Sequence, residues 1–103
     1  MKTKPKKLQL EEIDRFDARQ RGMRRMTIPG IGIYVGHRHA DADFWITSQE
    51  QILIRFATAD YKHYFRVILP AGFSVSRLDI DDFADCIHDE LYDWFEGARD
   101  ESF

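Results

Sequence analysis

The clearest pattern of hydrophobic and polar positions lies near the C-terminus, between Asp79 and Ala98. Its apolar residues recur at the i, i+3, i+4 and i+7 spacing of one helix face. They are Ile80, Phe83, Ala84, Ile87, Leu91, Trp94, Phe95 and Ala98. Asp79 suits the N-cap position, and Ser76 is a rival start. The pattern predicts an amphipathic helix whose apolar face covers one side of a sheet.

The middle of the chain alternates apolar and polar residues with the period of two that is typical of strands. The alternation predicts strands at about 31–35, 44–47, 52–57 and 61–69. Turn residues such as Pro29-Gly30 separate them, and the polar stretch His37–Asp43 is expected to be a connection. The middle of the chain is therefore predicted to be an antiparallel β-meander of about four strands.

The beginning of the chain predicts a tail and a helix. Residues 1–7 are rich in lysine, contain Pro5 and show no periodicity, so we expect a flexible basic tail. From about 8 to 23, an imperfect helical stripe is formed by Leu10, Ile13, Phe16 and Met23. The whole pattern predicts a single α+β domain over residues 8–103, with an N-terminal helix, the meander and an acidic C-terminal helix packed on one sheet face.

Composition limits the class of protein. The chain has 103 residues, 44% of them hydrophobic, which is enough for one core and too little for two. No apolar run approaches the roughly twenty residues of a membrane span, and no apolar stretch follows the basic start as it does in a signal peptide. We therefore expect no membrane association. The single cysteine, Cys86, excludes an internal disulfide and a cysteine-based zinc framework, which favours the cytoplasm. No cofactor and no metal site are expected.

The net charge of −3 hides an uneven distribution. Residues 1–26 hold nine Lys and Arg against four acids, whereas ten acids stand against one base from Asp79 onward. On the predicted helix, acids gather opposite the apolar stripe at Asp82, Asp85, Asp89, Asp93 and Glu96. Each like-charge pair at i, i+4 costs about 0.2–0.5 kcal/mol. This acidic face is interpreted first as a solvated surface, and second as a docking surface for a basic partner.

A cluster of histidines and aspartates supplies the candidates for chemistry. Alternate positions after Gly36, joined by one histidine from a later strand, give the set His37, His39, Asp41, Asp43 and His63. Imidazole titrates near neutral pH and carboxylates suit hard cations, so the set fits an acid/base pair or a divalent metal. No catalytic or metal-ligand motif is present, and Asp-rich loops commonly cap turns. A structural role is therefore preferred.

A second group of candidates alternates away from the expected core. It contains the aromatic and arginine residues Tyr34, Trp45, Arg55, Tyr64 and Arg66. Such residues are enriched in protein interfaces, and they also suit the stacking of single-stranded bases. Whether the predicted first helix covers this face is left open.

Taken together, these features favour a small non-enzymatic protein-interaction or regulatory module that forms a homodimer. Its contact surface is expected to be the acidic helix, the aromatic and arginine sheet face, or both, with a protein partner or a second copy as the occupant. The alternative is a metal-dependent or acid/base enzyme, or a small-ligand binder, that uses the His/Asp cluster. Single-stranded nucleic-acid binding is the third hypothesis.

Overall fold

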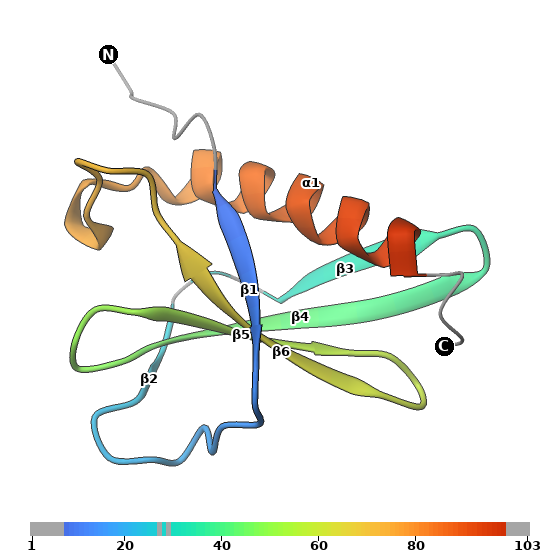
Figure 1. Cartoon of the computed structure of the whole chain (residues 1–103), viewed down its shortest axis with the longest axis horizontal. Helices are drawn as coiled ribbons and strands as arrows, with labels where there is room; N and C mark the ends of the chain where they lie inside the picture. The colour runs from blue at the N-terminus through green and yellow to red at the C-terminus, as the bar shows by residue number, and fades with distance from the viewer. Residues whose placement is uncertain (1–7, 27, 29, 99–103) are drawn as a thin grey trace.

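The computed structural model describes residues 8–26, 28 and 30–98, and shows an antiparallel sheet of six strands with one C-terminal helix (Figure 1). The elements are β1 (Gln9–Ile13), β2 (Arg24–Arg25), β3 (Ile31–Val35), β4 (Arg38–Ile46), β5 (Ile52–Ala57), β6 (Lys62–Ile68), the 3₁₀ turn η1 (Val75–Arg77) and α1 (Ile80–Ala98). The α+β class, the antiparallel sheet and the C-terminal helix are confirmed. The predicted tail at 1–7 lies outside the described residues.

Strand β4 is the longest strand and organises one side of the sheet. The strand order is β1-β6-β5-β4-β2, and β3 pairs with the part of β4 that β2 leaves open. Strand β3 pairs from Ile31 opposite Ala42 to Val35 opposite Arg38, while β2 faces Trp45 and Ile46. One edge of β4 is therefore shared by two short strands.

Helix α1 covers one face of this sheet, as Figure 1 shows. Four side chains of its apolar stripe are at most 1% exposed: Phe83, Ile87, Leu91 and Phe95. They pack against alternate residues of the central strands, including Phe44 and Phe56. The Asp79 carboxylate accepts a 3.1 Å hydrogen bond from the backbone N–H of Asp82, which confirms the predicted N-cap. Within the described part of the chain, no helix is both long and apolar enough to cross a membrane.

The predicted N-terminal helix is wrong, because the chain forms strand β1 there and pairs with β6. A spacing of three residues between Leu10 and Ile13 fits a helix, but the open edge of β6 offers a complete ladder of backbone hydrogen bonds. Leu8, just before β1, is buried to 2% exposure. The segment between β1 and β2 contains turns rather than a helix.

The prediction that His37–Asp43 is a connection is also wrong. Gly36, with φ of +62°, and His37 form a tight turn, and β4 begins at Arg38. The first half of β4 alternates: Ala40 and Ala42 are fully buried, whereas His39 and Asp41 are exposed on the other side. Alanine and aspartate are depleted in strands, which hid this alternation. Because β1 and β2 join the four predicted strands, the sheet has six strands instead of about four.

Candidate functional site

The sheet face opposite α1, called the second face here, carries all five predicted aromatic and arginine residues. Register places Arg55 opposite both Asp43 and Tyr64, and Trp45 opposite Leu53, which in turn lies opposite Arg66. Tyr34 lies on the same side, next to His39. Directly opposed residues of antiparallel strands share one face. The sequence-based grouping of Tyr34, Trp45, Arg55, Tyr64 and Arg66 therefore corresponds to one surface.

Two arginines are fixed over Trp45 by one carboxylate. Asp43 Oδ1 lies 2.7 Å from Arg25 Nη2, and Asp43 Oδ2 lies 3.4 Å from Arg55 Nη2. The two guanidinium groups stand 5.5 Å and 4.8 Å from the centre of the Trp45 ring. Cation–π attraction to Trp45 and one ion pair to each oxygen of Asp43 hold both guanidinium groups in place. Arg55 is thus presented in a fixed position.

Phe16 covers part of the second face. Its ring meets Trp45 and Tyr64 edge-on, with centroid separations of 5.7 Å and 5.1 Å. Trp45 is only 6% exposed as a result. Figure 1 shows the segment between β1 and β2 on the side of the sheet opposite α1. The sequence left open whether a first helix covers this face. In the structure no helix does so, and the turn-rich segment between β1 and β2 covers part of it.

A basic hollow of about 550 Å³ opens beside Phe16. Its lining consists of Arg15, Phe16, Asp17, Ala18, Arg19, Arg55, Lys62 and Tyr64, so four cations stand against one carboxylate. Asp17 accepts a 2.9 Å hydrogen bond from the backbone N–H of Arg19, and this bond lowers the pKa of the Asp17 carboxyl. The one acid that lines the hollow, Asp17, is therefore already hydrogen-bonded to the backbone of its own turn.

The positive lining is bounded on two sides. A neighbouring hollow shares Arg15, Lys62 and Tyr64 but adds the acids Glu12, Asp14 and Asp60 to its lining. On the side of β1, Arg66 forms an ion pair with Glu11. The basic hollow is thus a local site and does not continue as a long positive groove.

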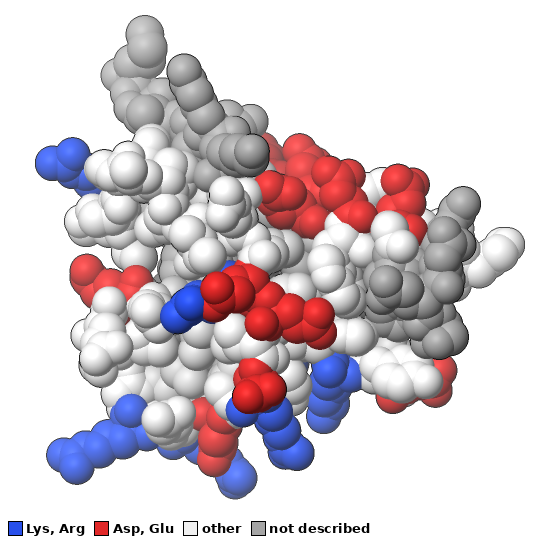
Figure 2. Space-filling view, viewed as in Figure 1, with Lys and Arg blue, Asp and Glu red and all other residues white. Residues whose placement is uncertain are grey.

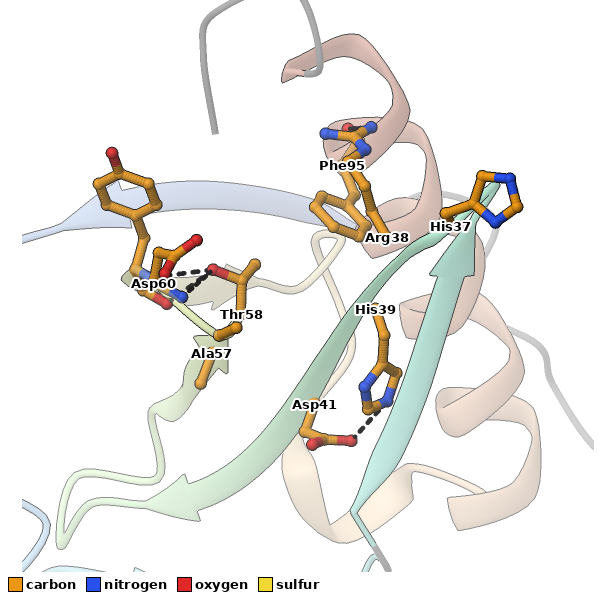
Figure 3. A pocket seen from close by; sticks show the side chains of 10 residues that line it. His37, Arg38, His39, Asp41, Ala57, Thr58, Asp60 and Phe95 are labelled. Atoms are coloured by element: carbon orange, nitrogen blue, oxygen red, sulfur yellow. Dashed lines mark hydrogen bonds and ion pairs between the residues drawn. The ribbon is translucent and has the colours of Figure 1, made fainter.

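Three of the predicted His/Asp candidates line another hollow, of about 480 Å³, called the end hollow here (Figure 3). It lies where β4 extends beyond the last β5 pair, Asp41 opposite Ala57, and its lining includes His37, His39 and Asp41. His39 Nε2 lies 3.0 Å from Asp41 Oδ1, and the imidazole stacks on Tyr34 at 4.5 Å. A carboxylate at one ring nitrogen orients the imidazole and sets which nitrogen carries the proton.

The two remaining candidates lie elsewhere. Asp43 is held between two arginines on the second face, and His63 lies on the α1 side, 3.5 Å from Glu12 and with its ring 4.8 Å from that of Trp94. In the described ranges, no group of three or more His, Cys, Asp and Glu residues is placed to hold a metal ion. The structure therefore places three of the five candidates around one hollow, with only His39 and Asp41 in contact, and puts Asp43 and His63 elsewhere.

The acidic face of α1 points to solvent. Asp85, Asp89, Asp93 and Glu96 are exposed, and Asp82 is half-buried at the helix start. Figure 2 shows acids gathered over α1 and most Lys and Arg on the opposite side of the molecule, where further acids lie between them. The predicted acidic surface and the basic hollow therefore occupy opposite sides.

Several residues of the basic hollow did not emerge as candidates from the sequence. Arg15, Arg19 and Lys62 were visible only as members of a charged stretch or a strand, because their meeting depends on the path between β1 and β2. Arg38, which donates a 3.0 Å hydrogen bond to the Phe95 carbonyl oxygen and lies over the Phe95 ring, was also missed.

Comparisons with protein-family models, curated proteins and solved structures gave no match. Function must therefore be argued from this geometry.

Proposed function

We propose that the chain is a non-enzymatic protein-interaction module that binds an acidic segment of a partner protein in the basic hollow. The observation that carries the proposal is the convergence of Arg15, Arg19, Arg55 and Lys62 around one hollow. Three of these cations are arginines, whose planar forks match carboxylates with paired hydrogen bonds. Arginine and tyrosine are also enriched among the residues that dominate binding energy.

The fixed position of Arg55 supports the same proposal. Its guanidinium is already held by Asp43 and Trp45, so binding loses little side-chain freedom at this residue. Phe16 and Tyr64 add apolar wall to the hollow. An acidic segment that also carries one apolar or aromatic side chain fits this lining best.

A single-stranded nucleic acid fits less well. Base stacking needs an open aromatic face, whereas Trp45 is 6% exposed and Phe16 meets it edge-on. A polyphosphate backbone would also leave the local hollow and pass Glu12, Asp14 and Asp60. Repulsion at these acids favours a short carboxylate-bearing segment over a long anionic strand.

The direct test is a titration of the ¹⁵N-labelled chain with a short glutamate-rich peptide that contains one phenylalanine. We expect amide shifts at residues 15–19, Arg55 and Lys62, and weaker binding at higher salt. The double variant Arg15→Gln/Arg19→Gln is expected to lower affinity tenfold or more, since losing a charge-assisted hydrogen bond costs about 1.5–3 kcal/mol. Arg77→Gln removes a charge from η1, outside the hollow, and is the matched control.

Three outcomes contradict the proposal. The first is the absence of shifts around the hollow, and the second is equal binding of a peptide in which lysine replaces glutamate. The third is tighter binding of an oligothymidine at the same residues, which would make the site a nucleic-acid interface.

A second candidate is a small-ligand or acid/base site in the end hollow, favoured by the contact between His39 and Asp41 in a lining that also includes His37. Titration with Zn²⁺, followed through the imidazole NMR signals, tests it. Unchanged signals from His37 and His39 would rule out metal binding there.

The acidic face of α1 remains a proposed surface for a basic partner. The cytoplasm is the expected compartment, because the chain has a single cysteine.

A further inference from the structure

The edges of the sheet differ sharply in charge. Strand β1 carries Glu11 and Glu12, and β2 consists of Arg24 and Arg25. Strand β3, with the sequence Ile-Gly-Ile-Tyr-Val, carries no charge and pairs only with β4 among the described residues. Unpaired edges invite pairing with another chain, and natural proteins usually protect them with charges, proline or cover. Strand β3 lacks the charges that guard the other two edges.

We propose that β3 pairs with β3 of a second copy of this chain in an antiparallel, two-fold symmetric homodimer with a continuous sheet. A strand that pairs antiparallel with its own copy produces the closed two-fold symmetry of most homodimers. The charge pattern selects this edge, because β1 paired with itself would bring glutamates together and β2 would bring arginines together. When β3 pairs with its own copy, no like charges face each other.

The side chains of β3 favour one register, centred on Ile33. In this register Gly32 of each copy lies opposite the partner's Tyr34. Tyr34 is 66% exposed, and its own ring and His39 Nε2 each lie 3.4 Å from the position of a Cβ at Gly32, so these two side chains already flank the glycine. The partner's Tyr34 would therefore pack beside the Tyr34 ring of this copy, and aromatic pairs across strands are favourable. On the other face, Ile31 would meet the partner's Val35 and extend the core.

One flank of α1 would lie near the proposed β3–β3 interface. Trp94 packs on Phe56 and Phe65, so its flank of the helix faces β5 and β6. The opposite flank, toward β3, presents Ala84, His88 and Tyr92 at a spacing of four residues, with the His88 and Tyr92 rings stacked at 6.4 Å. Asp81 shares this flank, because it lies seven residues before His88, and Asp85 borders it seven residues before Tyr92. Asp89 and Asp93 point away from it.

A continuous sheet places the second faces of both copies on the same side. The dimer would therefore present two basic hollows on the same side of the sheet, and a partner with two acidic segments would gain avidity. The proposed dimer does not rest on the proposed function, since β3 and the basic hollow share no residue.

The test is the solution mass by light scattering at low and high salt, for the wild-type chain and for Tyr34→Lys. We expect a salt-stable dimer for the wild type and at least a tenfold weaker dimer for Tyr34→Lys, which sets two lysines near the two-fold axis. Tyr61→Lys changes an exposed tyrosine in the turn between β5 and β6, and should leave the dimer intact. A monomeric wild type, a dimer lost at high salt, or equal behaviour of the two lysine variants would overturn the proposal.

A cross-linking experiment tests the register. In a Cys86→Ser background, Gly32→Cys combined with Tyr34→Cys is expected to form disulfides between copies on mild oxidation, because directly opposed strand residues lie within disulfide reach. A dimer that persists without such a disulfide would overturn the β3 pairing.

Discussion

The two faces of the sheet are built from the same strands and have different chemistry. Under α1, Phe44, Ile54, Phe56 and Phe65 are at most 1% exposed, and the face is apolar throughout the centre of the sheet. On the second face, the buried Trp45 is surrounded by the Arg25–Asp43–Arg55 network and by Phe16. Alternation along each strand therefore separates a core layer from a layer of fixed charges.

This difference assigns different roles to the two faces. Burial of large apolar side chains supplies most of the free energy of folding, and the face under α1 holds nearly all of them. The second face buries less apolar surface and holds arginines in place. We expect substitutions on the first face to change stability strongly, and substitutions around the basic hollow to change binding with little effect on stability.

The largest effect is expected from Leu91→Ala. Leu91 is fully buried between α1 and the sheet, so truncation leaves a cavity and should lower the free energy of unfolding by about 2–5 kcal/mol. Urea denaturation measures this change. The exposed neighbour Asp89→Ala is the control and should change stability by no more than about 0.5 kcal/mol. A near-neutral Leu91→Ala would contradict the assignment of the core to this face.

Phe16→Ala is expected to have a smaller effect, of about 1–3 kcal/mol, because its half-buried ring makes two edge-on aromatic contacts. Its removal should also expose Trp45, which a red shift of the tryptophan fluorescence would report. A loss as large as that of Leu91→Ala would mean that the second face is a full core in its own right.

Asp79→Ala tests the start of the helix that separates the two faces. The lost hydrogen bond to the Asp82 backbone N–H should destabilise the chain by about 1 kcal/mol. Asp79→Asn keeps a side-chain oxygen that caps the helix and should restore most of this loss. Equal losses in the two variants would contradict a capping role.

The smallest effect concerns Asp17 in the basic hollow. Its pKa lies below the ordinary 3.8 because the Arg19 backbone N–H donates to the carboxylate. A lowered folded-state pKa stabilises the fold above the unfolded-state pKa, and this contribution is lost as the pH falls through the folded-state value. We therefore expect the Asp17 carboxyl signal in NMR to titrate below pH 3.8. Titration above that pH would contradict the hydrogen-bonded turn.

The sequence was sufficient to predict the parts of the fold whose periodicity is strong. Helix α1, its Asp79 cap and strands β3, β5 and β6 all follow long or regular patterns. Strand β1 was missed because its five residues gain their conformation from pairing with β6, which a local pattern does not report. The first half of β4 was missed because its buried positions, Ala40 and Ala42, are small and weak in strand propensity.

The second face could be predicted, and the basic hollow could not. Alternation put Arg55 and Tyr64 each on the side of its strand away from the expected core, and the register of β5 and β6 sets them opposite each other. Arg15 and Arg19 reach the same place only because the segment after β1 turns back over the sheet and Phe16 packs on Trp45. Such a path depends on tertiary contacts between residues far apart in the sequence.

The separation of roles between the two faces is tested most directly by measuring both stability and binding on the double variant Arg15→Gln/Arg19→Gln. We predict a free energy of unfolding within about 0.5 kcal/mol of the wild type, because both side chains are exposed, and an affinity for the glutamate-rich peptide at least tenfold lower. Unchanged affinity, or a loss of binding that merely follows unfolding, would contradict the account.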